Sequence, residues 1–176
     1  MTLNTSEVRI KVSKILSETN IDSPPVPIET IAKQLGIQVQ FELLPNKLSG
    51  LLYREDKKVK PIIGVNRLHP EVRQRFTIAH EIGHFILHKE PVHVDREYDV
   101  KFRDPNSSLA NNDSEIEANK FAAEMLMPID FLKKDIDNRN INIPDDDFIE
   151  ILSQRYEVSM QAMIYRLQNL GYISKV

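Results

Sequence analysis

Apolar residues recur at helical spacing at the start of the chain and then at alternating positions. A helix over residues 5–18 collects four apolar residues on one face: Val8, Val12, Ile15 and Leu16. The stretch SPPVP at residues 23–27 interrupts the chain, and a short helix follows that stops at Gly36. Strand-like runs come next at residues 37–43, 50–54 and 61–66. The pattern predicts two helices followed by a small sheet.

The remainder of the chain has a mainly helical pattern. Residues 70–89 read as a long helix, residues 114–127 as a second one, and the residues after them as two or three shorter helices. Residues 91–113, between the two long helices, lack a clear periodicity. Loops of more than about 12–15 residues are usually functional or disordered, so we expect this one beside an active site. The whole pattern predicts an α+β fold.

The length and the pattern together predict one domain. A chain of 176 residues has the length of a single domain. We expect it to comprise N-terminal helices, a small sheet, two central helices with their loop, and a helical C-terminal part, over residues 1–35, 36–66, 70–128 and 129–176.

The composition excludes several classes of protein and of metal site for this sequence. The formal net charge of −3 gives no overall basic field for nucleic acid or anionic lipid. Without cysteine, any metal must be held by His, Asp or Glu. Residues 1–18 lack the apolar run of a signal peptide, and the chain has no 18 consecutive apolar residues. We therefore expect a cytoplasmic protein with no membrane or nucleic-acid partner.

Residues 75–90, RFTIAHEIGHFILHKE, contain three of the five histidines: His80, His84 and His88. On a helix these histidines and Glu81 fall within about 100° of arc, and apolar residues fill most of the remaining circumference. A helix that is apolar almost all round is buried. A lone core histidine is common, but several unpaired polar groups on a buried stripe cost roughly 2–7 kcal/mol each. A bound metal ion would satisfy them together.

The spacing within this stripe is that of a known zinc site. Residues 80–84, HEIGH, have the H-E-x-x-H pattern. Residues four apart on a helix stand one above the other, so His80 and His84 can reach one Zn²⁺ ion. Glu81 is turned away from the line of the two ligands, toward a water on the metal. The sequence thus predicts two ligands and a general base on one helix.

A catalytic zinc site needs a third protein ligand. The longer motif H-E-x-x-H-x-x-G-x-x-H is not met, because Leu87 and Glu90 stand where it has Gly and His. His88, one turn past His84, is a local alternative. Three ligands on one straight helix converge poorly on a single ion, so a ligand from another element fits better.

The second long helix offers such a ligand in SEIEANKFAAEMLMP, residues 114–128. Glu115 shares its face with Asn119 and apolar residues, whereas Glu117 shares its face with Lys120 and Glu124. We therefore expect Glu115 to face the core and Glu117 to face solvent. Asn119 could then hold the ring of a ligand histidine in place. A carboxylate favoured only by the helix dipole in the first turn remains an alternative for Glu115.

RFTIAHEIGHFILH followed further along by EIEANKFAAEMLMP resembles the ImmA/IrrE family of zinc metallopeptidases. Weaker agreement runs from IETIAKQLGIQV through LSGLLY and PIIGVN to YEVSMQAMIYRLQNLGYI, so it covers most of the chain. The resemblance implies a zincin-like fold, with a small twisted sheet packed on the central H-E-x-x-H helix. It also implies one Zn²⁺ per chain, held by His80 and His84, with Glu81 as catalytic base. A His/His/Glu site accepts other divalent metals as well.

The same resemblance bears on the third ligand and on the partner. In related metallopeptidases this ligand is a Glu followed four residues later by Asp, and here Glu115 is followed by Asn119. Asn weakens the hydrogen bond to a ligand histidine without removing it. Family members are known or proposed to cleave helix-turn-helix repressors or antitoxin-like regulators encoded nearby. The resemblance therefore implies such a protein as the substrate.

Further roles in peptide hydrolysis have several candidates. His88, His93 and Tyr98 are available to stabilise a tetrahedral oxyanion, although His93 and Tyr98 also suit solvated loop positions. The substrate is expected to lie extended along an exposed sheet edge formed by residues 50–56 or 59–66, because extended peptides add to sheets as strands.

Two other classes of function stay open. The C-terminal segment DFIEILSQRYEVSMQAMIYRLQNLGYI has helix-turn-helix spacing, which suits a DNA-binding regulator. Residues 145–176 hold three basic against five acidic residues, a net charge of −2 that disfavours phosphate binding. The alternative is that Ile149, Leu152, Met163, Leu167 and Leu170 simply close the core. A regulator that binds its partner without cutting it fits the same sequence.

Overall fold

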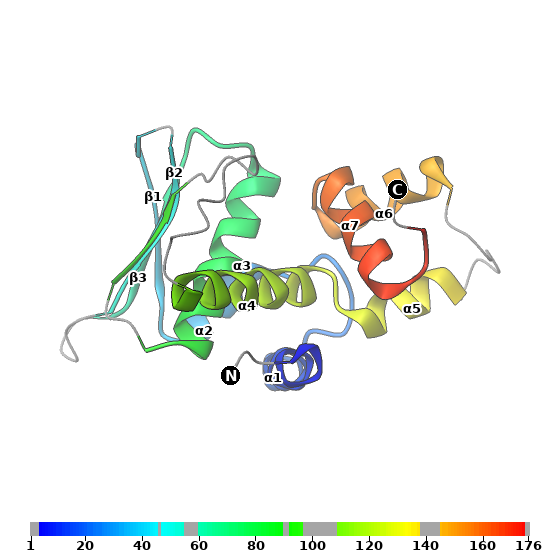
Figure 1. The fold of residues 1–176 in the computed structure, drawn as a ribbon, viewed down its shortest axis with the longest axis horizontal. Coiled ribbons are helices and arrows are strands. Elements are labelled where there is room, and N and C mark those ends of the chain that lie inside the picture. Colours follow the sequence, from blue (N-terminus) through cyan, green and yellow to red (C-terminus); the bar gives the residue numbers. More distant parts are fainter. Residues whose placement is uncertain are drawn as a thin grey trace.

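The computed structural model describes residues 4–45, 47–54, 60–89, 92–96, 109–137 and 145–174, with the backbone alone for 93–96 and 109–112. The elements are α1 (Thr5–Glu18), α2 (Ile28–Gln34), β1 (Gln38–Glu42), β2 (Leu48–Tyr53), β3 (Ile62–Asn66), α3 (Glu71–Leu87), β4 (Val92–Arg96), α4 (Leu109–Leu126), α5 (Ile129–Asp137), α6 (Asp146–Tyr156) and α7 (Met160–Leu170). Figure 1 shows the sheet at one end, α3 and α4 crossing in the middle, and α5–α7 at the other end. The predicted α+β fold is confirmed.

The sheet has the strand order β1-β3-β2-β4. β1 pairs with β3 in parallel, and β2 pairs with both β3 and β4 in antiparallel. Residues 50–56 and 59–66 were expected to offer an exposed edge, and this prediction is wrong. β2 and β3 are the two inner strands, and within the described residues the edges are β1 and β4.

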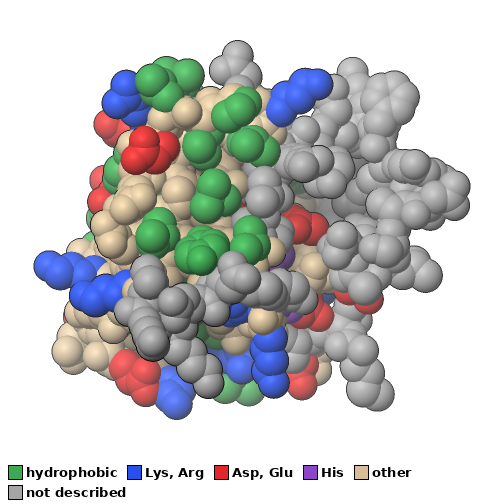
Figure 2. Space-filling model, turned by 90° about the vertical axis from the view of Figure 1, so that its left-hand side faces the viewer, with side chains coloured by type: hydrophobic (Ala, Val, Ile, Leu, Met, Phe, Trp, Pro, Cys, Tyr) green, Lys and Arg blue, Asp and Glu red, His purple; other side chains and the backbone are tan. Residues whose placement is uncertain are grey.

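One face of the sheet packs on the helices and the other is turned outward. Leu52, Ile63 and Val65 are fully buried, and Leu51 and Tyr53, which alternate with Leu52, are partly exposed. This alternation places every second side chain on each face. Figure 2 shows hydrophobic side chains gathered on the outward face.

Residues 91–113, expected as a loop, contain regular structure at both ends. β4 occupies Val92–Arg96, and α4 begins at Leu109, five residues before the expected start at Ser114. The segment VHVDR alternates apolar and polar residues, which is a strand signal that is easily overlooked in so short a run. Asp113 and Ser114 therefore lie inside the helix.

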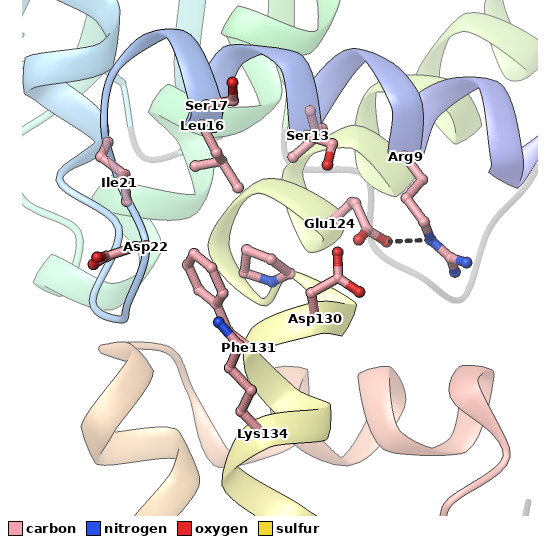
Figure 3. A pocket seen from close by; sticks show the side chains of 12 residues that line it. Arg9, Ser13, Leu16, Ser17, Ile21, Asp22, Glu124, Asp130, Phe131 and Lys134 are labelled. Atoms are coloured by element: carbon pink, nitrogen blue, oxygen red, sulfur yellow. Dashed lines mark ion pairs between the residues drawn. The ribbon is translucent and has the colours of Figure 1, made fainter.

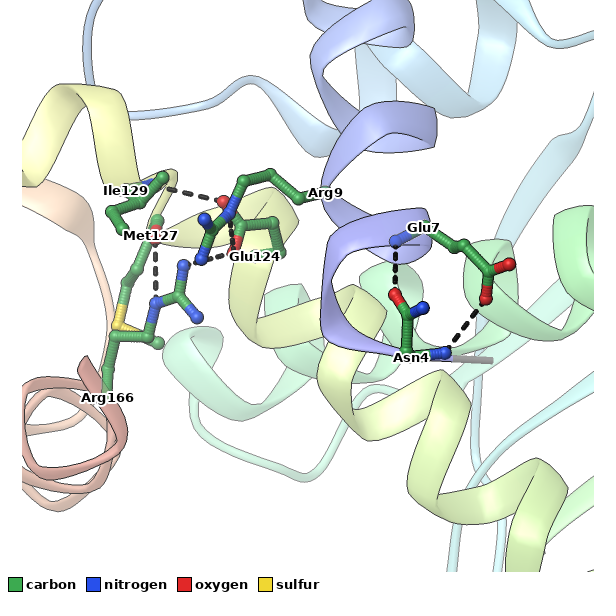
Figure 4. A network of polar contacts seen from close by, with 7 residues as sticks. All are labelled: Asn4, Glu7, Arg9, Glu124, Met127, Ile129 and Arg166. Carbon is green, nitrogen blue, oxygen red and sulfur yellow. Dashed lines mark hydrogen bonds and ion pairs between the residues drawn. The ribbon is translucent and has the colours of Figure 1, made fainter. Parts of the chain in front are cut away.

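α4 is covered on more than one side, which corrects the expected exposure of two carboxylates. Glu117 is 6% and Glu124 is 3% exposed, although both were placed on a solvent-facing stripe. The stripe was assigned from residue type, but α4 contacts α1 as well as α3. Glu124 is compensated by Arg166 of α7, whose Nη2 lies 2.5 Å from Glu124 Oε2, as Figure 4 shows. Burial of a charge requires such a partner.

The C-terminal helices are fixed to the rest of the fold by charged groups and by apolar packing. Arg75 of α3 lies 3.1 Å from Glu157 Oε2 in the turn between α6 and α7, and it donates to the Val26 carbonyl oxygen. Burial lowers the pKa of Arg75, and the Glu157 carboxylate opposes this effect. Ile149, Leu152, Met163 and Leu167 are buried, with Leu170 partly buried against them, so their packing role is confirmed. No helix in the described ranges is long and apolar enough to span a bilayer.

α3 and α4 approach each other closely because α3 has a glycine at the crossing. A Cβ atom added at Gly83 would lie 3.1 Å from Ala118 Cα, 3.2 Å from the Ala118 carbonyl oxygen and 3.2 Å from Phe121 Cβ. The first two are backbone atoms, which cannot move without shifting α4. Gly83 therefore sets the distance between the two helices.

We expect Gly83→Ala to destabilise the protein by up to about 2 kcal/mol. Helix propensity alone favours Ala over Gly by about 1 kcal/mol, but overpacking typically costs about 1–3 kcal/mol, and here the crowded atoms are backbone. The free energy of unfolding from urea denaturation measures the net effect. A gain in stability of the size given by propensity would contradict the proposed crowding.

Candidate metal centre

The polar stripe of α3 is buried in the middle of the molecule. α3 begins after Pro70, whose carbonyl oxygen accepts the first helical hydrogen bonds from Arg73 and Gln74. His80 is 3%, Glu81 is 0% and His84 is 2% exposed. The expected burial of this stripe is confirmed.

The two histidines of α3 and Glu115 of α4 converge on one point. His80 Nε2 lies 3.1 Å from His84 Nε2. Glu115 Oε2 lies 3.4 Å from His80 Nε2, and Glu115 Oε1 lies 3.5 Å from His84 Nε2. Among the described residues, these three form the cluster whose geometry suits a metal ion.

The separations fit a tetrahedral zinc ion. Ligand atoms about 2.0–2.1 Å from such an ion stand about 3.3 Å from one another, which is the edge of the tetrahedron. The Nε2–Nε2 separation of 3.1 Å lies close to this value, and so do the separations of 3.4 and 3.5 Å from the two histidines to the two oxygens of the Glu115 carboxylate. Two imidazoles and one carboxylate are also the protein ligand set of several zinc hydrolases. The residues present therefore fit the metal that the sequence predicts.

Asn119 determines which nitrogen of His80 faces the cluster as an acceptor. His80 Nδ1 lies 3.1 Å from Asn119 Oδ1, an atom that can only accept, so Nδ1–H is the donor. A neutral His80 then presents the Nε2 lone pair to Glu115 and His84. The convergence of such acceptors favours a cation between them. Asn119 lies where the sequence places it, beside a histidine ring.

The face of α4 that carries Glu115 and Asn119 is more open than expected. The Glu115 side chain is 32% exposed, and Asn119 is exposed as well. Glu115 faces the two histidines as expected, but it is partly exposed and not buried in the core. Since α4 begins at Leu109, Glu115 stands in the second turn, and the first-turn dipole explanation does not apply. The open side leaves access for water.

His88 lies outside the ligand cluster. α3 ends at Leu87, and His88 caps it in an extended conformation with φ −120° and ψ 171°, so it leaves the helical stripe. Its Nε2 lies 3.2 Å from the Ser114 carbonyl oxygen and 3.9 Å from Glu117 Oε2. His88 thus joins the end of α3 to α4 next to the buried Glu117.

Two residues that the sequence analysis did not single out support the site. Gly50 lies in β2, and Arg54 directly follows that strand. A Cβ atom at Gly50 would lie 2.4 Å from Thr77 Cγ2 and 3.7 Å from Glu81 Oε1, so β2 packs directly on α3 at Glu81. Arg54 donates to the Phe85 carbonyl oxygen at 2.8 Å. The sequence offered one signal for Gly50, because a glycine inside a strand often marks the close approach of another segment.

Two candidates for oxyanion stabilisation cannot be placed. His93 stands opposite Leu52 in the β2–β4 ladder, but its side chain is outside the described atoms. Tyr98 lies outside the described residues altogether.

Comparison with solved structures supports the fold. A transcriptional regulator from Mycobacterium tuberculosis matches with a TM-score of 0.64 and 18% sequence identity, over 93% of this chain. The match covers 46% of that protein, so this chain spans about half its length. No curated protein sequence matches the chain significantly. Residues 32–168 match the peptidase family M78, described as the IrrE N-terminal-like domain, and the chain therefore belongs to this family.

Proposed function

We propose that this protein is a cytoplasmic zinc-dependent endopeptidase that cleaves a helix-turn-helix repressor or antitoxin-like regulator. The observation that carries the proposal is the convergence of His80, His84 and Glu115 at tetrahedral spacing in a member of a peptidase family. The structural match with a similar fold is a transcriptional regulator, which supports a role for this protein in regulation. The substrate class itself rests on the family resemblance.

The proposed reaction is hydrolysis of a peptide bond. His80, His84 and Glu115 would hold a divalent ion, whose charge would polarise the peptide carbonyl and lower the pKa of water in the site. Glu81 accepts a proton from the attacking water and passes it to the leaving amine. Asn119 keeps His80 in the tautomer that binds through Nε2.

The choice of third ligand predicts an order of zinc affinities. Glu115→Ala removes a ligand and should lower zinc affinity by more than about 100-fold, whereas Asn119→Ala should lower it by about 10–100-fold. Glu117→Gln, which keeps the size of a buried side chain on the same helix, should bind zinc nearly as wild type. Competition with a chelator measures all three variants. An order in which Glu117→Gln is the weakest would reassign the third ligand.

Glu81→Gln separates catalysis from metal binding. We expect the variant to keep its zinc and its thermal stability but to lose about 10²–10⁴-fold in hydrolysis, because the base is removed and the ligands stay. A quenched-fluorescent peptide mixture measures hydrolysis. A transcriptional reporter for the regulator encoded nearby measures the relief of repression. If the zinc-loaded variant relieves repression as well as wild type, the protein acts by binding its partner and proteolysis is not the mechanism.

A further inference from the structure

A large groove lies along α4 on the side that α7 faces. It has a volume of about 920 Å³, and its walls come from α1, α3, α4, α7 and the turn before α7. Val8, Phe76, Met127, Tyr165 and Leu170 are among the apolar and aromatic residues that line it. Its volume and mostly apolar lining are typical of a binding site.

One end of the groove lies beside the metal-ligand cluster. Asn119, which lines the groove, contacts His80, and Ile116 of the groove directly follows Glu115. Phe76, also in the wall, has its ring centroid 6.3 Å from that of His80. A chain lying in the groove would therefore extend along α4 toward the residues that hold the metal.

The groove is positive although the protein as a whole is negative. Among the described residues that line it, four are basic and one is acidic: Arg9, Arg73, Lys120, Arg166 and Glu124. The formal charge of this lining is +3, against −3 for the whole chain. Such a reversal attracts acidic ligands to one place on an otherwise acidic molecule.

The contacts of Arg9, Arg166 and Lys120 leave positive charge uncompensated. Glu124 Oε2 faces two guanidinium groups, Arg166 at 2.5 Å and Arg9 at 3.8 Å, so one carboxylate serves two cations (Figure 4). Lys120 makes no ion pair within the described part of the chain. It therefore stands in the wall with its charge available to a ligand.

A second cavity, shown in Figure 3, differs in its charge. It has a volume of about 260 Å³ and lies between α1 and the start of α5. Two basic residues face three acidic ones there: Arg9, Lys134, Asp22, Glu124 and Asp130. It is smaller, lies on the other side of the Arg9–Glu124 pair and lacks an excess of cations. The positive, apolar lining belongs to the larger groove.

We propose that the groove along α4 binds an acidic segment of the protein substrate that carries apolar anchor residues, and that Lys120 and Tyr165 select it. This inference rests on the proposed peptidase function and adds a substrate class to it. The apolar walls take the anchor side chains, and Tyr165, 59% exposed, offers an aromatic surface for one of them. Nucleic acid, the other anionic polymer, would leave this apolar lining unused.

The test uses zinc-loaded Glu81→Gln protein, which holds peptides without turning them over. The immobilised protein is incubated with a random dodecapeptide library, and the retained peptides are sequenced. We expect enrichment of Asp and Glu together with apolar residues. Lys120→Glu in the same background should remove the acidic enrichment and raise the Kd of an enriched peptide about fivefold to tenfold, because it replaces an attraction with a repulsion.

Two further variants make the test specific. Lys133→Glu makes the same charge change on an exposed face of α5 outside the groove and should retain peptides as the parent does. Tyr165→Ala should weaken retention without altering the preference for acidic residues. Melting curves establish that each variant is folded.

The outcomes distinguish this proposal from the peptidase assignment. No retained peptides, no acidic enrichment, or an enrichment that Lys120→Glu leaves unchanged would overturn the groove as an acidic-segment site. Displacement of the peptides by 20-base-pair random duplex DNA at equal or lower concentration would assign the groove to nucleic acid. If acidic peptides bind as expected but wild-type protein does not cut them, the groove stands and the peptidase function fails.

Discussion

The close crossing of α3 and α4 is the contact on which the candidate centre depends. Its ligand atoms come from two helices and must stand within a few tenths of an ångström of the tetrahedral spacing. Gly83 allows this, because an added Cβ would lie 3.1 Å from the Ala118 Cα atom. Glu115 is three residues from Ala118, so the same crossing that packs the core also sets the reach of the carboxylate to His80 and His84.

Contacts around the crossing hold both helices in place. On one side β2 packs on α3 at Gly50, where Thr77 Cγ2 and the Gly64 carbonyl oxygen leave no room for a side chain. On the other, α4 is joined to α7 through Glu124 and Arg166, and Glu124 also accepts a hydrogen bond from the Ile129 backbone at the start of α5. Removing one partner of a buried ion pair usually costs more than the pair contributes, because the other charge is left uncompensated. The C-terminal helices thus support the centre and also form a wall of the positive groove.

The sequence predicted the local parts of this arrangement well. The i, i+4 spacing of His80 and His84 is a property of one helix, and so is the separation around α4 that leaves Glu115, rather than Glu117, facing these two histidines. The prediction from sequence failed where the exposure of a side chain or the place of a strand depends on which elements pack together. Glu117 and Glu124 were read as solvent-facing because carboxylates usually are, but α4 is covered by α1 and α3 and Arg166 compensates Glu124. The inner place of β2 followed from β4, a five-residue strand with a weak signal, and that of β3 followed from its parallel pairing with β1. His88 left the stripe because α3 ends at Leu87.

X-ray absorption at the zinc edge of the zinc-loaded protein tests the central claim most directly. The proposed centre predicts two imidazole nitrogens at about 2.0–2.1 Å and carboxylate oxygen at about 2.0–2.2 Å, with one zinc per chain. Glu115→Ala should remove the carboxylate contribution and leave the two imidazoles. A spectrum with oxygen ligands alone, or with a third imidazole in place of the carboxylate, would contradict a centre built from His80, His84 and Glu115.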